Sequence, residues 1–207
     1  CLQDCRGEYI ALCEGDDYWT DCEKLSKQVA VLEQYTSYSM CFHSVTKAEE
    51  KQDKIVEIPP LKGSHIEFVD LLKYYNFIFT CTVMFRNKLS LPQWYLNMPI
   101  GDFPLFFLLS RTGPFYFLNN SMAYYRYHGK GAWSGTSQLS RLSTFRFLYQ
   151  ILIPMANNTE KQLMNTGIQK YNEYIAAHRY PTQKMRRVLL RNFLKWKHAL
   201  AFRFKLY

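Results

Sequence analysis

The hydrophobic and polar positions of the chain predict that it opens with a strand followed by a helix. The run from Glu8 to Cys13 is short and apolar and contains a β-branched and an aromatic residue, as in a strand buried on both faces. It ends in an acidic turn. The segment from Thr20 to Glu23 then has capping-box spacing, which predicts a helix capped by Thr20. The expected apolar stripe of this helix is Leu25, Val29 and Leu32.

The same criteria predict an α/β fold for the rest of the first two thirds of the chain. Strands are expected at residues 39–45, 79–86, 115–118 and 122–126, and an Asn119-Asn120 turn joins the last two. Helices are expected at 68–75 and 101–110, and the polar stretch 46–57 is expected to be a surface loop. Together these elements indicate a mixed sheet with flanking helices.

Charge divides the chain into two regions. Residues 1–138 carry 13 Lys and Arg against 15 Asp and Glu, whereas residues 139–207 carry 13 against 2. The second region also has a helical pattern without strand alternation. We therefore expect one domain over 1–138 and a basic, mainly helical region over 139–207.

Neither end of the chain suggests secretion or membrane insertion. No apolar stretch is long enough to cross a bilayer, and the first residues lack the pattern of a signal peptide. The six cysteines form no C-x-x-C pair, which favours free thiols in the cytoplasm; a disulfide among them is the alternative. The chain starts at Cys1, not Met, a few residues before the first strand, so we expect it to be a fragment.

Three carboxylates lie in the turn after the first strand, which we call the acidic turn (Glu14 to Asp17). Glu14, Asp16 and Asp17 fall within four residues at the end of a buried strand, where open α/β sheets place ligands. Carboxylates this close repel one another unless a cation lies between them, and Mg²⁺ or Mn²⁺ is the natural partner. The alternative is an ordinary acidic surface turn that leads into the helix.

The segment around this turn resembles the DXD segment of inverting family 2 bacterial glycosyltransferases of the GT-A fold. The matching sequence is Tyr9-Ile10-Ala11-Leu12-Cys13-Glu14-Gly15-Asp16-Asp17-Tyr18-Trp19-Thr20-Asp21, followed by Lys24-Leu25-Ser26-Lys27-Gln28-Val29. The resemblance implies a GT-A-like sheet that lacks its N-terminal nucleobase-binding units. It also implies that Glu14 and Asp16 hold the metal and that Asp17 contacts the donor diphosphate. Glu14 departs from the usual Asp at the first position.

Two further segments resemble the same family. Met98-Pro99-Ile100-Gly101-Asp102-Phe103-Pro104-Leu105 is similar to the segment whose Asp opens a helix and acts as the catalytic base, a role that inverting transfer requires. Taken alone, Asp102 would be a helix N-cap. Tyr125-Arg126-Tyr127-His128-Gly129 is similar to the Tyr-Arg-x-His that closes the catalytic domain. This resemblance implies that Arg126 and His128 contact the diphosphate of the nucleotide-sugar donor and that His128 also lies near the metal.

These motifs lead us to expect an enzyme that moves a sugar from a nucleotide-diphosphate sugar to a glycan or lipid-linked acceptor, in bacterial cell-surface polysaccharide synthesis. The alternatives are a non-catalytic carbohydrate- or membrane-binding remnant of the fold and a metal-dependent nucleotidyltransferase. The segment 184–207 is a basic amphipathic pattern that suits an anionic membrane surface; packing on the catalytic domain is the equally weighted alternative. No recognition motif for nucleic acid accompanies the charge.

Overall fold

The computed structural model describes residues 2–49, 52–56, 63–127, 131, 133, 135–179 and 191. The chain forms two compact units. The first, here called the sheet unit, comprises Cys1–Asp70 and Asn76–Tyr127, and the second, the helical unit, comprises Leu71–Tyr75 and His128–Tyr207. Each is described separately below.

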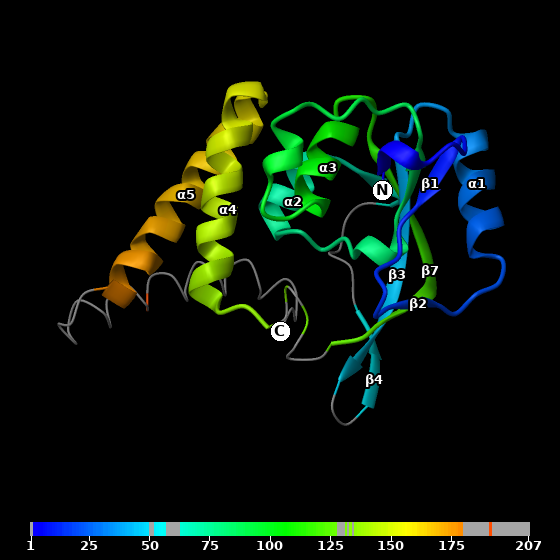
Figure 1. Cartoon of the computed structure of the whole chain (residues 1–207), viewed down its shortest axis with the longest axis horizontal. Coiled ribbons are helices and arrows are strands. Elements are labelled where there is room, and N and C mark those ends of the chain that lie inside the picture. Colours follow the sequence, from blue (N-terminus) through cyan, green and yellow to red (C-terminus); the bar gives the residue numbers. More distant parts are fainter. Residues whose placement is uncertain are drawn as a thin grey trace. The chain divides into compact units, whose positions relative to one another are not determined.

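The sheet unit is built on a mixed sheet, which confirms the α/β class (Figure 1). In the described residues the strand order is β1-β6-β3-β7-β2, with β4 paired to β3 and β5 paired to β7. The pairing of β3 with β7 is parallel and the other pairings are antiparallel. The strands are β1 (Tyr9–Ala11), β2 (Tyr18–Trp19), β3 (Met40–Glu49), β4 (Gln52–Ile55), β5 (His65–Ile66), β6 (Met84–Arg86) and β7 (Phe115–Tyr125).

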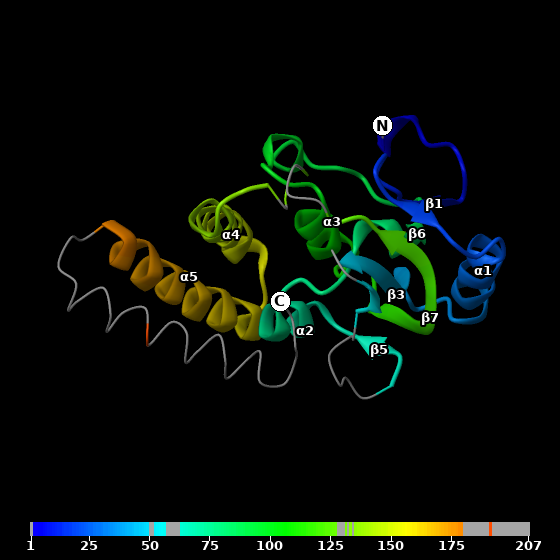
Figure 2. The same cartoon turned by 90° about the horizontal axis from the view of Figure 1, so that it is seen from below.

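Helices cover the sheet on both sides. Helix α1 (Lys24–Gln34) lies on one side and α3 (Asp102–Leu109) on the other (Figures 1 and 2). Helix α3 is almost wholly buried because its sequence is apolar around its whole circumference. The remaining elements of the sheet unit are the 3₁₀ turns η1 (Leu2–Asp4), η2 (Thr80–Thr82) and η3 (Tyr95–Asn97). Helix α2 (Phe68–Tyr74) begins in the sheet unit and continues into the helical unit from Leu71.

Three predicted elements differ from the structure. The expected surface loop at 46–57 instead continues β3 to Glu49 and forms a hairpin with β4. The first half of the expected strand 79–86 is the 3₁₀ turn η2, and only Met84–Arg86 is a strand. The two strands expected around Asn119-Asn120 are one strand, β7, because its pairing to β3 continues past these residues through register shifts.

The start and the buried face of α1 also differ from prediction. The helix begins at Lys24, and its N-cap residue is Glu23, whose side chain makes no capping hydrogen bond; Thr20 lies before the helix. Leu25 is 41% exposed, whereas Lys24, Gln28 and Leu32 are buried. Leu32 is therefore buried as predicted, but the buried positions before it are Lys24 and Gln28, one residue earlier than the expected Leu25 and Val29.

A histidine is buried in the core of the sheet unit. His43 on β3 is 1% exposed, and its Nδ1 lies 2.7 Å from the carbonyl oxygen of Ser44. Within the described residues its Nε2 has no hydrogen-bond partner. Burial lowers the pKa of His43 to about 4. Within the described residues, His43 is thus a core histidine whose Nδ1 alone is hydrogen-bonded.

In its described residues the helical unit contains the helices α4 and α5, which a short turn joins. Helix α4 (Gln138–Leu152) is capped by the hydroxyl of Ser137 and leads through η4 (Ile153–Met155) into α5 (Asn158–Arg179). The helices pack side by side, and Tyr149 of α4 meets Tyr171 of α5 with ring centroids 5.7 Å apart. Gly167 allows this approach, since a Cβ there would lie 2.7 Å from the Tyr149 ring. The amphipathic segment predicted at 184–207 lies outside the described residues, apart from Arg191.

Two expectations about the chain as a whole can be compared with the described residues. None of the described helices combines the length and apolarity needed to cross a membrane. The described cysteines Cys5, Cys13, Cys22, Cys41 and Cys81 form no disulfide with one another.

The buried His43 predicts a specific pH dependence of stability. Between pH 6.5 and 4 the unfolded chain binds a proton at His43 that the folded chain excludes. The contribution of His43 to the free energy of unfolding is therefore fully present above pH 6.5 and is lost as pH falls towards 4. The pKa shift corresponds to on the order of 3 kcal/mol. Denaturant unfolding of His43→Asn should show a flatter pH dependence than the parent chain. The exposed His65→Asn serves as control, and a His43→Asn profile that follows the parent would contradict the assignment.

Candidate functional site

The acidic turn is held between two strands of the sheet. After β1, the amide of Leu12 donates to the Val83 carbonyl at 3.1 Å. The turn closes with a hydrogen bond from the Asp17 amide to the Glu14 carbonyl at 3.2 Å. Beyond β2, the amide of Thr20 donates to the Met122 carbonyl at 3.0 Å. The turn is thus anchored at both ends, and its side chains are presented from a fixed backbone.

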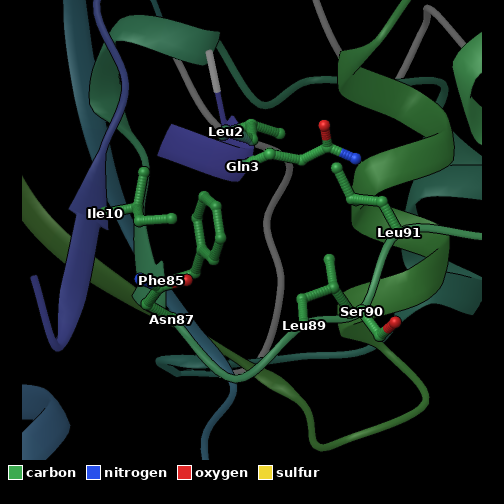
Figure 3. Close-up of a pocket in the computed structure, with 8 residues that line it drawn as sticks. All are labelled: Leu2, Gln3, Ile10, Phe85, Asn87, Leu89, Ser90 and Leu91. Atoms are coloured by element: carbon green, nitrogen blue, oxygen red, sulfur yellow. The ribbon is translucent and has the colours of Figure 1, made fainter. Parts of the chain in front are cut away.

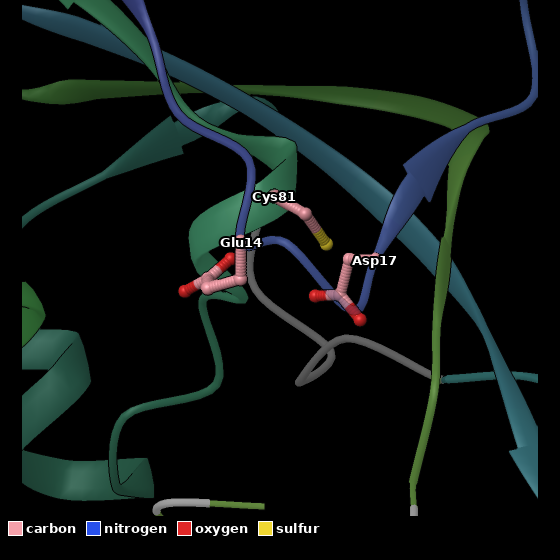
Figure 4. A group of neighbouring side chains, drawn as sticks. All are labelled: Glu14, Asp17 and Cys81. Carbon is pink, nitrogen blue, oxygen red and sulfur yellow. The ribbon is translucent and has the colours of Figure 1, made fainter.

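Three side chains gather at this turn, and we call them the ligand group. One potential ligand atom each from Glu14, Asp17 and Cys81 lies within 4.8 Å of the other two (Figure 4). Glu14 is exposed and Asp17 is half-buried, whereas Cys81 on η2 is fully buried. The group therefore joins two carboxylates from the turn with a thiol that is 64 positions further along the chain.

Hydrogen bonds and burial set the protonation of the ligand group. Asp17 Oδ1 accepts a hydrogen bond from the backbone amide of Arg126 at 3.0 Å, and the Asp17 carboxyl accepts another from the Cys81 thiol. Burial nevertheless raises the pKa of this carboxyl. Although the Glu14 residue is exposed overall, partial desolvation of its carboxyl raises the pKa, opposed by a hydrogen bond from the Thr80 side chain. Burial and the charge of Asp17 raise the pKa of the Cys81 thiol. A cation placed here would lower all three pKa values by favouring the charged forms.

The chemistry of the ligand group fits a divalent cation with some affinity for sulfur. Two carboxylate oxygens suit Mg²⁺ and Mn²⁺, while a thiolate is a ligand for softer ions such as Zn²⁺ and Cd²⁺. The carboxylates provide the negative charge, and the protonated Cys81 would have to release its proton to coordinate. Mn²⁺ tolerates this mixed set better than Mg²⁺ does.

The other predicted metal and diphosphate residues lie differently. Asp16 is exposed and is not a member of the ligand group, in which Asp17 takes the place expected for it. Arg126 contacts the turn through its main chain, and its guanidinium lies 5.2 Å from the centroid of the Tyr18 ring. His128 lies outside the described residues.

Asp102, the predicted base, is the first residue of α3 and not its N-cap, which is Gly101. It is half-buried, and its Oδ2 accepts a hydrogen bond from the Asn76 amide nitrogen at 3.0 Å. Burial raises the pKa of Asp102, opposed by backbone amides and by Asn76. The charge of Asp102 in turn contributes to the raised pKa of Glu14. Asp102 and the acidic turn therefore lie within electrostatic range of each other.

Two residues of this site were not identified from the sequence. Cys81 falls within the strand expected at 79–86 and belongs to no motif, and Asn76, which orients Asp102, follows a helix and has no motif around it. Both come from segments far from the acidic turn in the sequence. No local spacing could have linked them to it.

Trp19 packs against the candidate site, and a surface pocket lies apart from it. Trp19 is half-buried and its indole nitrogen donates to the Cys81 carbonyl at 3.0 Å, so it packs beneath the turn. A separate pocket of about 260 Å³ lies between η1, β1 and the segment after β6 (Figure 3). Its lining contains none of the predicted site residues; it is formed by Leu2, Gln3, Ile10, Phe85, Asn87, Leu89, Ser90 and Leu91.

If Cys81 is a ligand, replacing it should change metal preference. Cys81→Ser is expected to weaken Cd²⁺ binding by at least about tenfold while leaving Mn²⁺ binding nearly unchanged, because only the softer ion gains from sulfur. Isothermal titration with each ion measures both affinities. Cys5→Ser is the matched control, and equal Cd²⁺ affinity in the two variants would remove Cys81 from the ligand group.

Comparison with known proteins gives relatives without an assigned function. No family model matches the chain. The chain is 44% identical over 132 residues to the uncharacterized protein Mb1547 of Mycobacterium bovis and to the uncharacterized protein Rv1520 of Mycobacterium tuberculosis. The matched residues are 64% of this chain and 38% of each relative. The chain is thus similar to a part, well under half, of longer mycobacterial proteins.

Proposed function

We propose that this chain is the catalytic part of an inverting nucleotide-sugar glycosyltransferase of family 2, with a GT-A-like sheet. The proposal rests on the order of the three motifs along the sequence. Electrostatics lends support: the charge of Asp102 makes a small contribution to the raised pKa of Glu14, although Asp102 is 88 positions further along the chain. Transfer of a sugar from a donor diphosphate to an acceptor hydroxyl requires a general base close to the group that binds the diphosphate.

In the proposed reaction Asp102 acts as general base. It accepts the proton of the acceptor hydroxyl while that oxygen forms a bond to C1 of the sugar and the bond from C1 to the diphosphate breaks. A carboxyl with a raised pKa is the stronger base, and the amide of Asn76 holds it in one orientation. Inversion follows from a single displacement, so no covalent intermediate on the protein is needed.

Glu14 and Asp17, together with Asp16 by resemblance, would hold Mg²⁺ or Mn²⁺ at the donor. When bound, the cation would neutralise negative charge on the diphosphate leaving group. The main-chain amide of Arg126 fixes Asp17, and Arg126 and His128 would supply further contacts to the diphosphate. Since Glu14 is exposed, the turn is open to a ligand from solvent.

We further propose a cytoplasmic location, at the inner face of the plasma membrane, with a nucleotide-diphosphate sugar as donor and a glycan or lipid-linked acceptor. The support is the excess of basic residues over 139–207, which carries 13 Lys and Arg against 2 acidic residues. Basic segments are attracted to anionic lipid, where a lipid-linked acceptor is found. Nucleic acid is not among the proposed partners.

The proposed base is tested by Asp102→Asn in the full-length product of the gene. The amide cannot accept the proton but keeps the size and the hydrogen bond with Asn76, so transfer should fall by at least about 10²-fold. Donor binding should stay within about twofold, since the base acts on the acceptor. Transfer is measured as released nucleoside diphosphate, and donor affinity by calorimetry.

Asp4→Asn, the same chemical change at an exposed position, is the control and should leave both quantities unchanged. Retained transfer in Asp102→Asn would exclude Asp102 as the base. Absence of any metal-dependent binding of UDP- or GDP-sugars by the parent protein would instead favour the non-catalytic remnant. Release of pyrophosphate in place of a nucleoside diphosphate would identify a nucleotidyltransferase.

A further inference from the structure

Helix α1 turns a charged side chain into the interior. Lys24 is 1% exposed, and it shares the buried face of the helix with Gln28 and Leu32, both fully buried. Its ammonium donates to Gln28 Oε1 at 2.7 Å and lies 4.3 Å from the centroid of the Trp19 ring. Among the described residues no carboxylate lies within ion-pair distance of it. A buried lysine without an ionic partner is rare in proteins.

The partners of Lys24 lead to the segment that carries the ligand group. Gln28 Nε2 donates to the carbonyl of Thr82 at 2.9 Å and to that of Cys41 at 3.2 Å. Trp19 Nε1 donates to the carbonyl of Cys81 at 3.0 Å. Two adjacent carbonyls of η2 are therefore held, one by each of the groups that contact the Lys24 ammonium.

Turn η2 supplies two contacts to the acidic turn. Its Cys81 thiol belongs to the ligand group and donates to Asp17, and its Thr80 side chain is hydrogen-bonded to Glu14. Any shift of η2 relative to β2 would move both contacts. The position of η2 thus determines whether Cys81 and Thr80 reach the carboxylates of the acidic turn.

Burial of the Lys24 ammonium opposes folding. Burial lowers the pKa of Lys24 to about 8, which means that the interior favours the neutral amine. An unbranched apolar side chain would fill the same space without this cost, as replacements of buried charges in other proteins show. A benefit other than stability is therefore needed to explain a lysine here, and orientation of Gln28 and Trp19 supplies it.

We infer that Lys24 is a positioning residue for the acidic turn: its buried ammonium orients Gln28 and Trp19, and through them fixes η2 against Glu14 and Asp17. This inference rests on the proposed function in that the turn is taken to be the metal- and donor-binding segment. Lys24 is not proposed to contact the metal or the donor itself. Its effect passes through the two carbonyls of η2.

The inference is tested by amide hydrogen exchange of the full chain, with Lys24→Met as the variant. The reporting amides are those of Asp17, Thr20 and Val83. Their hydrogen bonds lie in the acidic turn, just after β2 and at the end of η2, respectively. We expect their exchange to accelerate by about tenfold, the effect of removing a desolvated cation–π contact. Amides of Ser110 and Phe117, elsewhere in the sheet unit, should keep their rates.

Lys27→Met provides the control, since Lys27 lies on the same helix but is partly exposed and pairs with Asp21 and Glu23. It should leave all of these amides unchanged. Unchanged rates at Asp17, Thr20 and Val83 in Lys24→Met would overturn the inference. Equal acceleration at Ser110 and Phe117 would overturn it as well, because Lys24 would then stabilise the unit as a whole.

Two further measurements complete the test. If Lys24→Met does not fold, Trp19→Leu removes the ring beneath the ammonium and should accelerate exchange at the same three amides; parent rates there would contradict the inference. Mn²⁺ titration of the parent and of Lys24→Met separates the two proposals. A parent chain that binds no Mn²⁺ argues against the proposed function, while the exchange rates still decide the role of Lys24.

Discussion

The carbonyls of Cys81 and Thr82 join three parts of the sheet unit that are far apart in the sequence. They accept hydrogen bonds from Trp19, beside the acidic turn, and from Gln28, in the middle of α1. Because η2 is a single 3₁₀ turn, it has few internal hydrogen bonds and depends on these external donors for its position. The ligand group forms only because η2 and the acidic turn are held together. The geometry of the candidate site is therefore set by packing under the sheet.

The order of elements was largely predictable because it depends on local patterns. The apolar run at Glu8–Cys13 and the apolar helix after Gly101 are recognisable without any tertiary information. The errors occurred where tertiary contacts override such patterns. Asn119 and Asn120 favour a turn, but the parallel ladder with β3 holds them in β7, and the polar residues after Val45 form a hairpin.

The candidate site was predictable in part. The carboxylates of the acidic turn are close in sequence, so their proximity follows from the chain itself. Cys81, Asn76 and the buried face of α1 depend on how distant segments meet, and polar residues at 24 and 28 give a misleading amphipathic pattern. A sequence pattern based on hydrophobicity assigns Lys24 to the surface. Its burial depends on Gln28 and Trp19, which the fold brings into contact with the Lys24 ammonium.

The register shifts between β3 and β7 have a consequence for the tolerance of this fold to insertions and deletions. Side chains of a strand alternate between faces, so a register change of one residue exchanges the two faces. The shifts near Ser44 decide that Tyr124 faces Tyr18, with ring centroids 5.1 Å apart, and that the amide of Arg126 reaches Asp17. A residue gained or lost between Leu118 and Ser121 would therefore leave the first half of β7 intact and turn its second half over. The strand that supports the acidic turn is consequently less tolerant of length variation at its polar centre than the hydrophilic character of Asn119 and Asn120 would suggest.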